Sequence, residues 1–179
     1  MSSSNLIRWC GMAAVVAGGM SIAVDLVVLA IFGLGQSFGE ALISSGLLFQ
    51  SVAAPLTGAL LLLGLVGLYA RQSEATGVAG LVSFLVAFVG TVLAQGSVLA
   101  SLLADLGWAL FGVASLRARV YPRVASVLLI VGAVGTAVAS ALPRGEPGSV
   151  LMYAVIGADI ILNAAIAWLG FDLFAKRRG

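Results

Sequence analysis

The sequence predicts an all-α, polytopic integral membrane protein, folded as a single six-helix transmembrane bundle over residues 1–179. Three observations indicate this class. Apolar residues make up 61% of the chain and charged residues 9%, and the mean hydropathy is +1.17, whereas soluble domains are about 45–50% apolar and about 25% charged. The apolar residues form runs of about 20, the length that crosses a bilayer. The basic residues lie between these runs and not inside them.

Six helices are expected in order along the chain. The first run is too long for a secretory leader, contains Asp25 and lacks a cleavage site, so we expect it to remain as a helix. Short polar connections follow most runs, which makes consecutive helices antiparallel neighbours. In the longer connection, Ser37 and Glu40 match a capping box, which predicts either a short interfacial helix or an early start of the second span. The expected spans are 7–32, 47–70, 78–94, 97–116, 124–142 and 150–174.

The distribution of basic residues predicts the direction of the spans. With the N-terminus in the cytoplasm, an even number of spans also leaves the C-terminus there. Arg144 then lies outside, and the other basic residues lie inside: Arg8, Arg71, Arg117, Arg119, Arg123, Lys176, Arg177 and Arg178. This bias fits the positive-inside rule. We therefore expect a multi-pass protein of a prokaryotic plasma (cytoplasmic) membrane. Aromatic residues near span ends are expected to anchor in the headgroup layer: Trp9, Tyr69, Tyr121 and Tyr153.

The middle of the chain matches itself at an offset of 45 residues. Val89-Gly90-Thr91 aligns with Val134-Gly135-Thr136 in an ungapped match of residues 64–97 with 109–142. One interpretation is a parallel internal repeat of spans two and three in spans four and five. The other is chance similarity between alanine- and glycine-rich segments. In either case Gly90 and Gly135 are expected at close helix crossings, because glycine lets two backbones approach in lipid.

Three aspartates inside the predicted spans need an explanation, because a membrane-centred carboxylate costs about 2.5–3.5 kcal/mol on insertion scales. By helical rise, Asp25, Asp105 and Asp159 all fall in the outer half of the bundle. Asn163 follows Asp159 by one turn and shares its face. Pro55 falls in the same layer and predicts a helix kink that leaves a backbone carbonyl without its usual donor. These residues form a candidate proton or cation site; the alternative is local hydrogen bonding between helices.

The composition also excludes several kinds of chemistry. The chain has no histidine and one cysteine, which excludes imidazole metal sites, histidine catalysis and an intrachain disulfide. No nucleotide-binding motif stands in the required context. We therefore expect no cofactor, no metal, no nucleic-acid partner and no enzymatic activity.

Two functions remain, from different classes. The sequence alone favours a small membrane scaffold or accessory subunit, whose partners are the lipid bilayer and other membrane-protein subunits or further copies of itself. The alternative is a proton- or cation-coupled small transporter that uses the outer-half aspartates. The two differ in geometry: a transporter needs the acids to converge, whereas a scaffold can satisfy each acid on a separate face.

Overall fold

The computed structural model describes residues 3–33, 47–94, 97–142 and 149–175, and within these ranges the regular structure is entirely helical. In this part of the chain, five helices are long and apolar enough to cross a membrane, which confirms the all-helical, multi-pass membrane class. They are α1 (Ser3–Gly33), α3 (Leu47–Leu93), α4 (Val98–Ala118), α5 (Arg123–Ala141) and α6 (Val150–Ala175). The capping box of Ser37 and Glu40 lies outside the described residues, as do Arg144, Lys176, Arg177 and Arg178.

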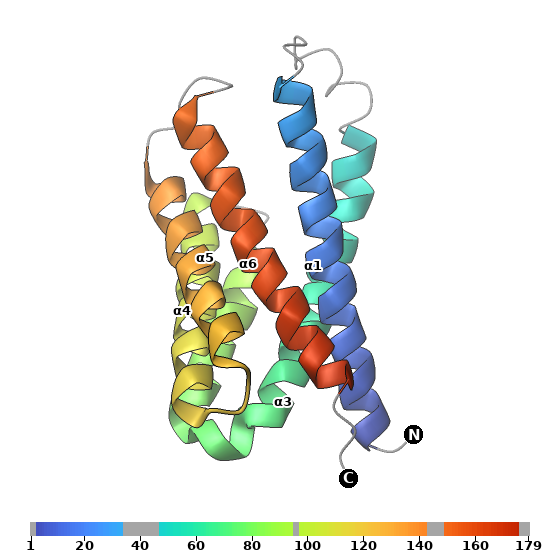
Figure 1. The fold of residues 1–179 in the computed structure, drawn as a ribbon, viewed down its shortest axis with the longest axis vertical. Coiled ribbons are helices and arrows are strands. Elements are labelled where there is room, and N and C mark those ends of the chain that lie inside the picture. Colours follow the sequence, from blue (N-terminus) through green and yellow to red (C-terminus); the bar gives the residue numbers. More distant parts are fainter. Residues whose placement is uncertain (1–2, 34–46, 95–96, 143–148, 176–179) are drawn as a thin grey trace.

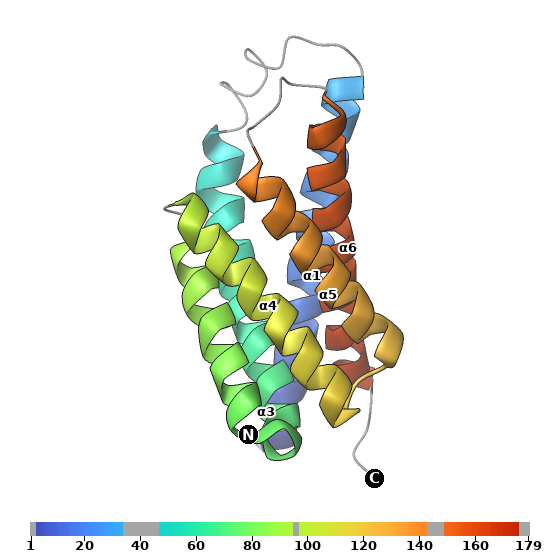
Figure 2. The same cartoon turned by 90° about the vertical axis from the view of Figure 1, so that its left-hand side faces the viewer.

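The long helix α3 consists of two arms, 47–76 and 78–93, that meet at Gly77. The backbone of Gly77 is non-helical, with φ 54° and ψ −140°, a conformation that glycine adopts without a Cβ clash. Tyr69 on the first arm stacks on Phe84 on the second with ring centroids 4.5 Å apart, so the second arm folds back along the first, as Figures 1 and 2 show at the lower end of the bundle.

The expected span 47–70 therefore ends too early, because the helix continues to Thr76. Polar residues at these positions do not stop a helix, and Thr76 stabilises the last turn by donating its hydroxyl to the Gln72 carbonyl at 2.9 Å. The chain reverses at Gly77, the residue of α3 with non-helical dihedral angles, and the kink at Pro55 stays a prediction. Pro55 remains within the helix and is exposed.

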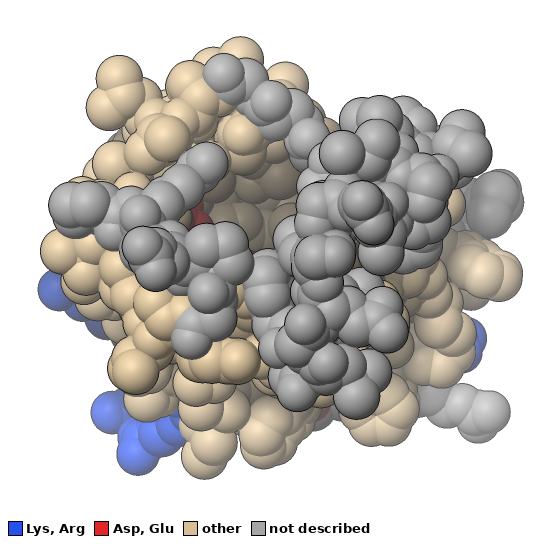
Figure 3. All heavy atoms as spheres, turned by 90° about the horizontal axis from the view of Figure 1, so that it is seen from above, with Lys and Arg blue, Asp and Glu red and all other residues tan. Residues whose placement is uncertain are grey.

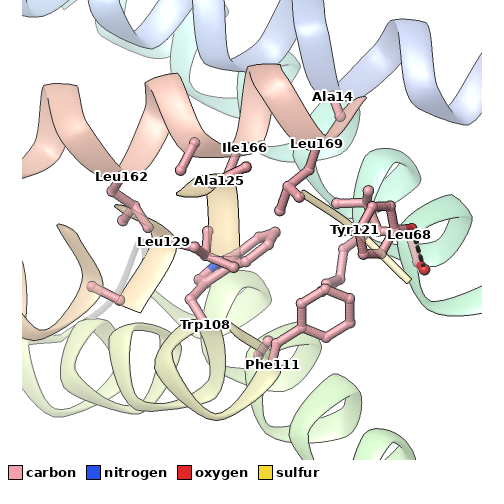
Figure 4. Packing of buried hydrophobic residues seen from close by; sticks show 14 of the residues in the cluster. Ala14, Leu68, Trp108, Phe111, Tyr121, Ala125, Leu129, Leu162, Ile166 and Leu169 are labelled. Carbon is pink, nitrogen blue, oxygen red and sulfur yellow. Dashed lines mark hydrogen bonds between the residues drawn. The ribbon is translucent and has the colours of Figure 1, made fainter. Parts of the chain in front are cut away.

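The helices pack as a bundle in which each element contacts its sequence neighbours and α6 returns to α1. The start of α1 and the end of α6 lie at the same end of the bundle (Figure 1). The core contains fully buried large side chains from α3, α4, α5 and α6, including Leu68, Phe111, Leu129 and Leu169. Figure 4 shows Trp108 and Phe111 pointing from α4 into this core, and their rings meet edge to face at 6.1 Å between centroids.

Glycines set the close helix crossings. An added Cβ on Gly90 would collide with the backbone of Ala104, and one on Gly107 would collide with the backbone of Ala87. The second arm of α3 and α4 therefore touch through their backbones twice. A Cβ on Gly135 would lie 2.8 Å from the Cβ of Ala158 on α6. The expectation that Gly90 and Gly135 occupy close crossings is confirmed.

One aromatic anchor is not where the sequence predicts it. Tyr121, in the connection between α4 and α5, is 4% exposed and donates its hydroxyl to the Leu68 carbonyl at 2.8 Å, as the dashed line in Figure 4 shows. The expectation of a headgroup anchor is wrong for this residue, because the short connection folds inward and its phenol reaches a backbone acceptor. Trp9, by contrast, is 63% exposed.

Candidate functional site

The crossing of α1 and α6 is built from small residues and fixes which polar residues meet. A Cβ on Gly18 would lie 2.5 Å from the backbone oxygen of Asn163, and one on Gly170 would lie 2.7 Å from the Cβ of Ala14. The two antiparallel backbones are therefore in contact over this stretch. Two helical turns beyond Gly18, the same register brings Asp25 of α1 to Asp159 of α6, whose side chains lie beside one another.

Asn163 organises the α6 side of this pair. Its Nδ2 group donates to the Asp159 backbone carbonyl at 3.0 Å and to Asp159 Oδ2 at 3.1 Å, and the residue is 5% exposed. The predicted polar stripe of α6 is thus a local hydrogen-bonded unit that faces the bundle interior. On α1, the Oδ2 atom of Asp25 is buried and has no hydrogen-bond partner in the described part of the chain.

Asp105 approaches the pair from α4 without joining it. Its carboxyl lies beside Thr136 of α5 and within electrostatic range of Asp159. The Thr136 hydroxyl lies within hydrogen-bond distance of the backbone carbonyls of Gly132 and Ala133, at 3.1 and 3.0 Å, as well as beside the Asp105 carboxyl. Asp105 therefore adds a third acidic group to the layer, and α4 and α5 hold it there.

We call Asp25, Asp105, Asp159 and Asn163 the acidic layer, and its acids are not neutralised by basic side chains of the described residues. Among the described residues, no lysine or arginine forms an ion pair with Asp25, Asp105 or Asp159. Two ionised carboxylates side by side repel strongly where the dielectric constant is low. Holding both charges side by side therefore costs free energy, which a proton shared between the two groups would relieve.

Acidic surface is visible at one end of the bundle. Figure 3 looks onto the end opposite the start of α1 and shows a hollow with acidic surface at its floor. Pro55 is exposed on α3, and the free carbonyl predicted beside it stays a prediction. The structure thus brings together Asp25, Asp159 and Asn163 closely and Asp105 loosely, and it leaves Pro55 aside.

A second polar cluster, at the opposite end, was not predicted from the sequence. Arg71 of α3 forms an ion pair with Asp172 of α6 at 3.1 Å, donates to the Asp172 backbone carbonyl at 3.3 Å and lies 5.1 Å over the Tyr121 ring. Burial raises the pKa of the Tyr121 phenol, which keeps it protonated as a donor. We call Arg71, Asp172 and Tyr121 the basic-end clasp, since together they tie α3, α6 and the α4–α5 connection.

Close by, Ser115 of α4 donates to Oε1 of the fully buried Gln72 at 2.7 Å. The clasp and this hydrogen bond close the bundle at its basic end. One feature of the sequence could have indicated the clasp: Arg71 ends the second predicted span and Asp172 lies near the end of the last one, at the same predicted depth.

No protein-family model matches this chain, and no curated protein or solved structure is significantly similar to it.

Proposed function

We propose that this protein is a small multi-pass membrane carrier in which Asp25 and Asp159 form a proton-binding pair. The observation that carries the proposal is the placement of these two carboxyl groups beside one another on crossing helices. Intramembrane acids that face a bundle interior are typical of proton relays. Asn163 positions Asp159, and Asp105 tunes the charge of the layer.

A proton is favoured over a metal cation as the coupling ion. Across the described ranges, no group of three or more histidine, cysteine, aspartate or glutamate residues could hold a metal ion, whereas Ca²⁺ and Mg²⁺ take six or more oxygen ligands. Two carboxyl groups and one amide are enough to hold a proton. The proposal assigns the protein no enzymatic activity.

Convergence of the acids is the reason to prefer a carrier over the scaffold that the sequence alone favours. A scaffold or accessory subunit needs only helix contacts, which the apolar faces and glycine crossings already supply. Placing carboxyl groups inside the membrane costs insertion free energy. A scaffold has no use for three such groups at the same depth that would offset this cost. The scaffold interpretation predicts that these acids can be neutralised without loss of function.

The proposal includes a topology with six crossings. The two arms of α3 cross separately, since Gly77 reverses the chain between them. Arg8, Arg71 and Arg117 belong to the end that holds the start of α1, and the positive-inside rule places that end in the cytoplasm of a prokaryotic cell, with both termini there. The hollow of Figure 3 then opens to the outside.

The parallel repeat is part of the same proposal. Gly90 packs on Ala104, whose neighbour Asp105 lies beside Thr136, the residue after Gly135. The two glycines therefore lie at a similar depth, as a duplication of spans two and three requires. Poor superposition of the two helix pairs would contradict the duplication.

The test of the carrier is a charge-displacement measurement, which requires no knowledge of the substrate. Proteoliposomes are adsorbed on a solid-supported membrane, and the pH is changed rapidly on the side that faces the outer end of the bundle. Proton binding to the acidic layer then displaces charge, which is measured as a transient current. We expect the current in the wild type and in Glu74→Gln, a control that removes an exposed acid elsewhere, and its loss in the Asp25→Asn/Asp159→Asn double variant. A double variant with the wild-type current would contradict the proposal and favour the accessory subunit.

A further inference from the structure

A groove runs along the outside of the bundle between α4 and the part of α3 around Gly77, from the end of the first arm into the second arm, at the basic end. Its volume is about 340 Å³. Small residues leave this space open: Ala75 and Ala79 line it from α3, and Ala114 and Ala118 line it from α4. The groove exists because four alanines occupy positions where larger side chains would fill the gap between two otherwise close helices.

The groove is apolar along its length. Val82 and Leu110 line it and are 50% and 40% exposed, so they face lipid when the helices cross a membrane. Two hydroxyl groups in its wall are turned to their own helix, since Thr76 donates to the Gln72 carbonyl and Ser83 donates to the Gly80 carbonyl, each at 2.9 Å. The walls therefore suit an alkyl chain.

One cation lies at the end of this apolar surface. Arg117 lines the groove, is exposed and forms no ion pair within the described part of the chain. It stands in the last turn of α4, seven residues after Leu110, which places it about 10 Å farther along the helix axis toward the membrane surface. A guanidinium at this level matches the phosphate of a lipid headgroup and can bind it through two N–H groups.

We propose that this groove binds an anionic phospholipid, with its phosphate on Arg117 and one acyl chain along Ala79, Val82 and Leu110. Charge complementarity selects this occupant, because basic residues at a helix end attract the anionic lipids of the facing leaflet. A helix from a second copy fits less well, since it would bury the Arg117 charge against an apolar surface without a partner. The site does not depend on the carrier proposal, only on the crossing of the membrane.

The test compares lipid retention in native mass spectrometry after extraction from nanodiscs of phosphatidylcholine with added phosphatidylglycerol. The wild type should retain phosphatidylglycerol. Arg117→Ala should retain about tenfold less, the loss expected from removing one charge-assisted hydrogen-bonded contact, and Ala79→Phe should lose it by filling the groove. Arg117→Lys should retain an intermediate amount, because a lysine supplies the charge without the planar fork.

The matched control is Arg123→Ala, which removes the same charge at the same end of the bundle from a residue outside the groove. It should retain the lipid as the wild type does. Equal loss in Arg117→Ala and Arg123→Ala would show only a general attraction of the basic end for anionic lipid and would overturn the site, as would wild-type retention in Ala79→Phe. Unchanged melting temperatures in pure phosphatidylcholine would show that the variants are folded.

Discussion

Breaking the basic-end clasp should loosen the bundle locally and expose Cys10. The side chains of Arg71 and Asp172 are 17% and 14% exposed, so this ion pair is partly buried. Exposed ion pairs contribute about 0–1 kcal/mol to stability, whereas removing one partner of a fully buried pair costs about 3–5 kcal/mol. Asp172→Asn removes one charge and keeps the backbone bond at 3.3 Å. We therefore expect a cost of about 2 kcal/mol, which lies between those limits.

The assay uses the single cysteine of the chain as its reporter. Cys10 is 8% exposed. It contacts Gly67 of α3, and Leu173, the neighbour of Asp172, lies beside the same glycine. Opening of the clasp should thus uncover the thiol. A cost of about 2 kcal/mol raises the open population, and with it the rate of maleimide labelling, about 30-fold.

Two controls make the result specific. Glu74→Gln removes an exposed acid near the clasp and should label at the wild-type rate. Replacing both partners, as Arg71→Met/Asp172→Leu, should cost less than the sum of the single variants, because neither charge is left without the other. Labelling of Asp172→Asn at the wild-type rate, with an unchanged melting temperature in detergent, would refute the argument that the clasp closes this end.

Three further predictions concern packing, titration and topology. Gly90→Leu should destabilise the bundle by at least about 1–3 kcal/mol, the cost of overpacking, while Gly157→Leu, where an added Cβ meets nothing within 4 Å, should melt as the wild type does. Because burial raises the pKa of Tyr121, the folded state retains this proton above the ordinary tyrosine value of about 10, so stability should fall as pH rises past that value. That fall should be smaller in Tyr121→Phe, and an equal fall would exclude this residue as its cause. A cysteine introduced by Glu74→Cys should resist membrane-impermeant labelling from outside intact cells, and its labelling there would reverse the proposed topology.

The apolar runs alone predicted where the helices lie. The observed α4 and α6 begin and end within one or two residues of the expected spans 97–116 and 150–174, because a run of the length that crosses a bilayer has to satisfy its backbone hydrogen bonds internally. The span 47–70 was predicted to end too early because the polar residues that follow it do not end the helix, which continues to Thr76. Polarity marks the membrane surface, and the reversal itself needed the positive φ of Gly77.

For the aspartates, the sequence predicted their depth in the membrane but not which of them are in contact. Helical rise predicted a shared depth for Asp25, Asp105 and Asp159, because depth depends only on the distance along each helix from its basic end. Which acids touch depends on how the helices rotate and cross, and glycines such as Gly18 and Gly170 set that arrangement from positions two or more turns away. For the same reason Tyr121 could not be predicted to turn inward.

The sequence by itself determined the membrane class, the helix positions and the levels of the charged groups, since hydrophobicity and helical rise are properties of a single segment. Only the tertiary structure decided that Asp25 meets Asp159 and that Arg71 meets Asp172. Those contacts depend on the register between helices distant in the chain, and the register follows from the packing of small residues against backbone, which no single segment specifies.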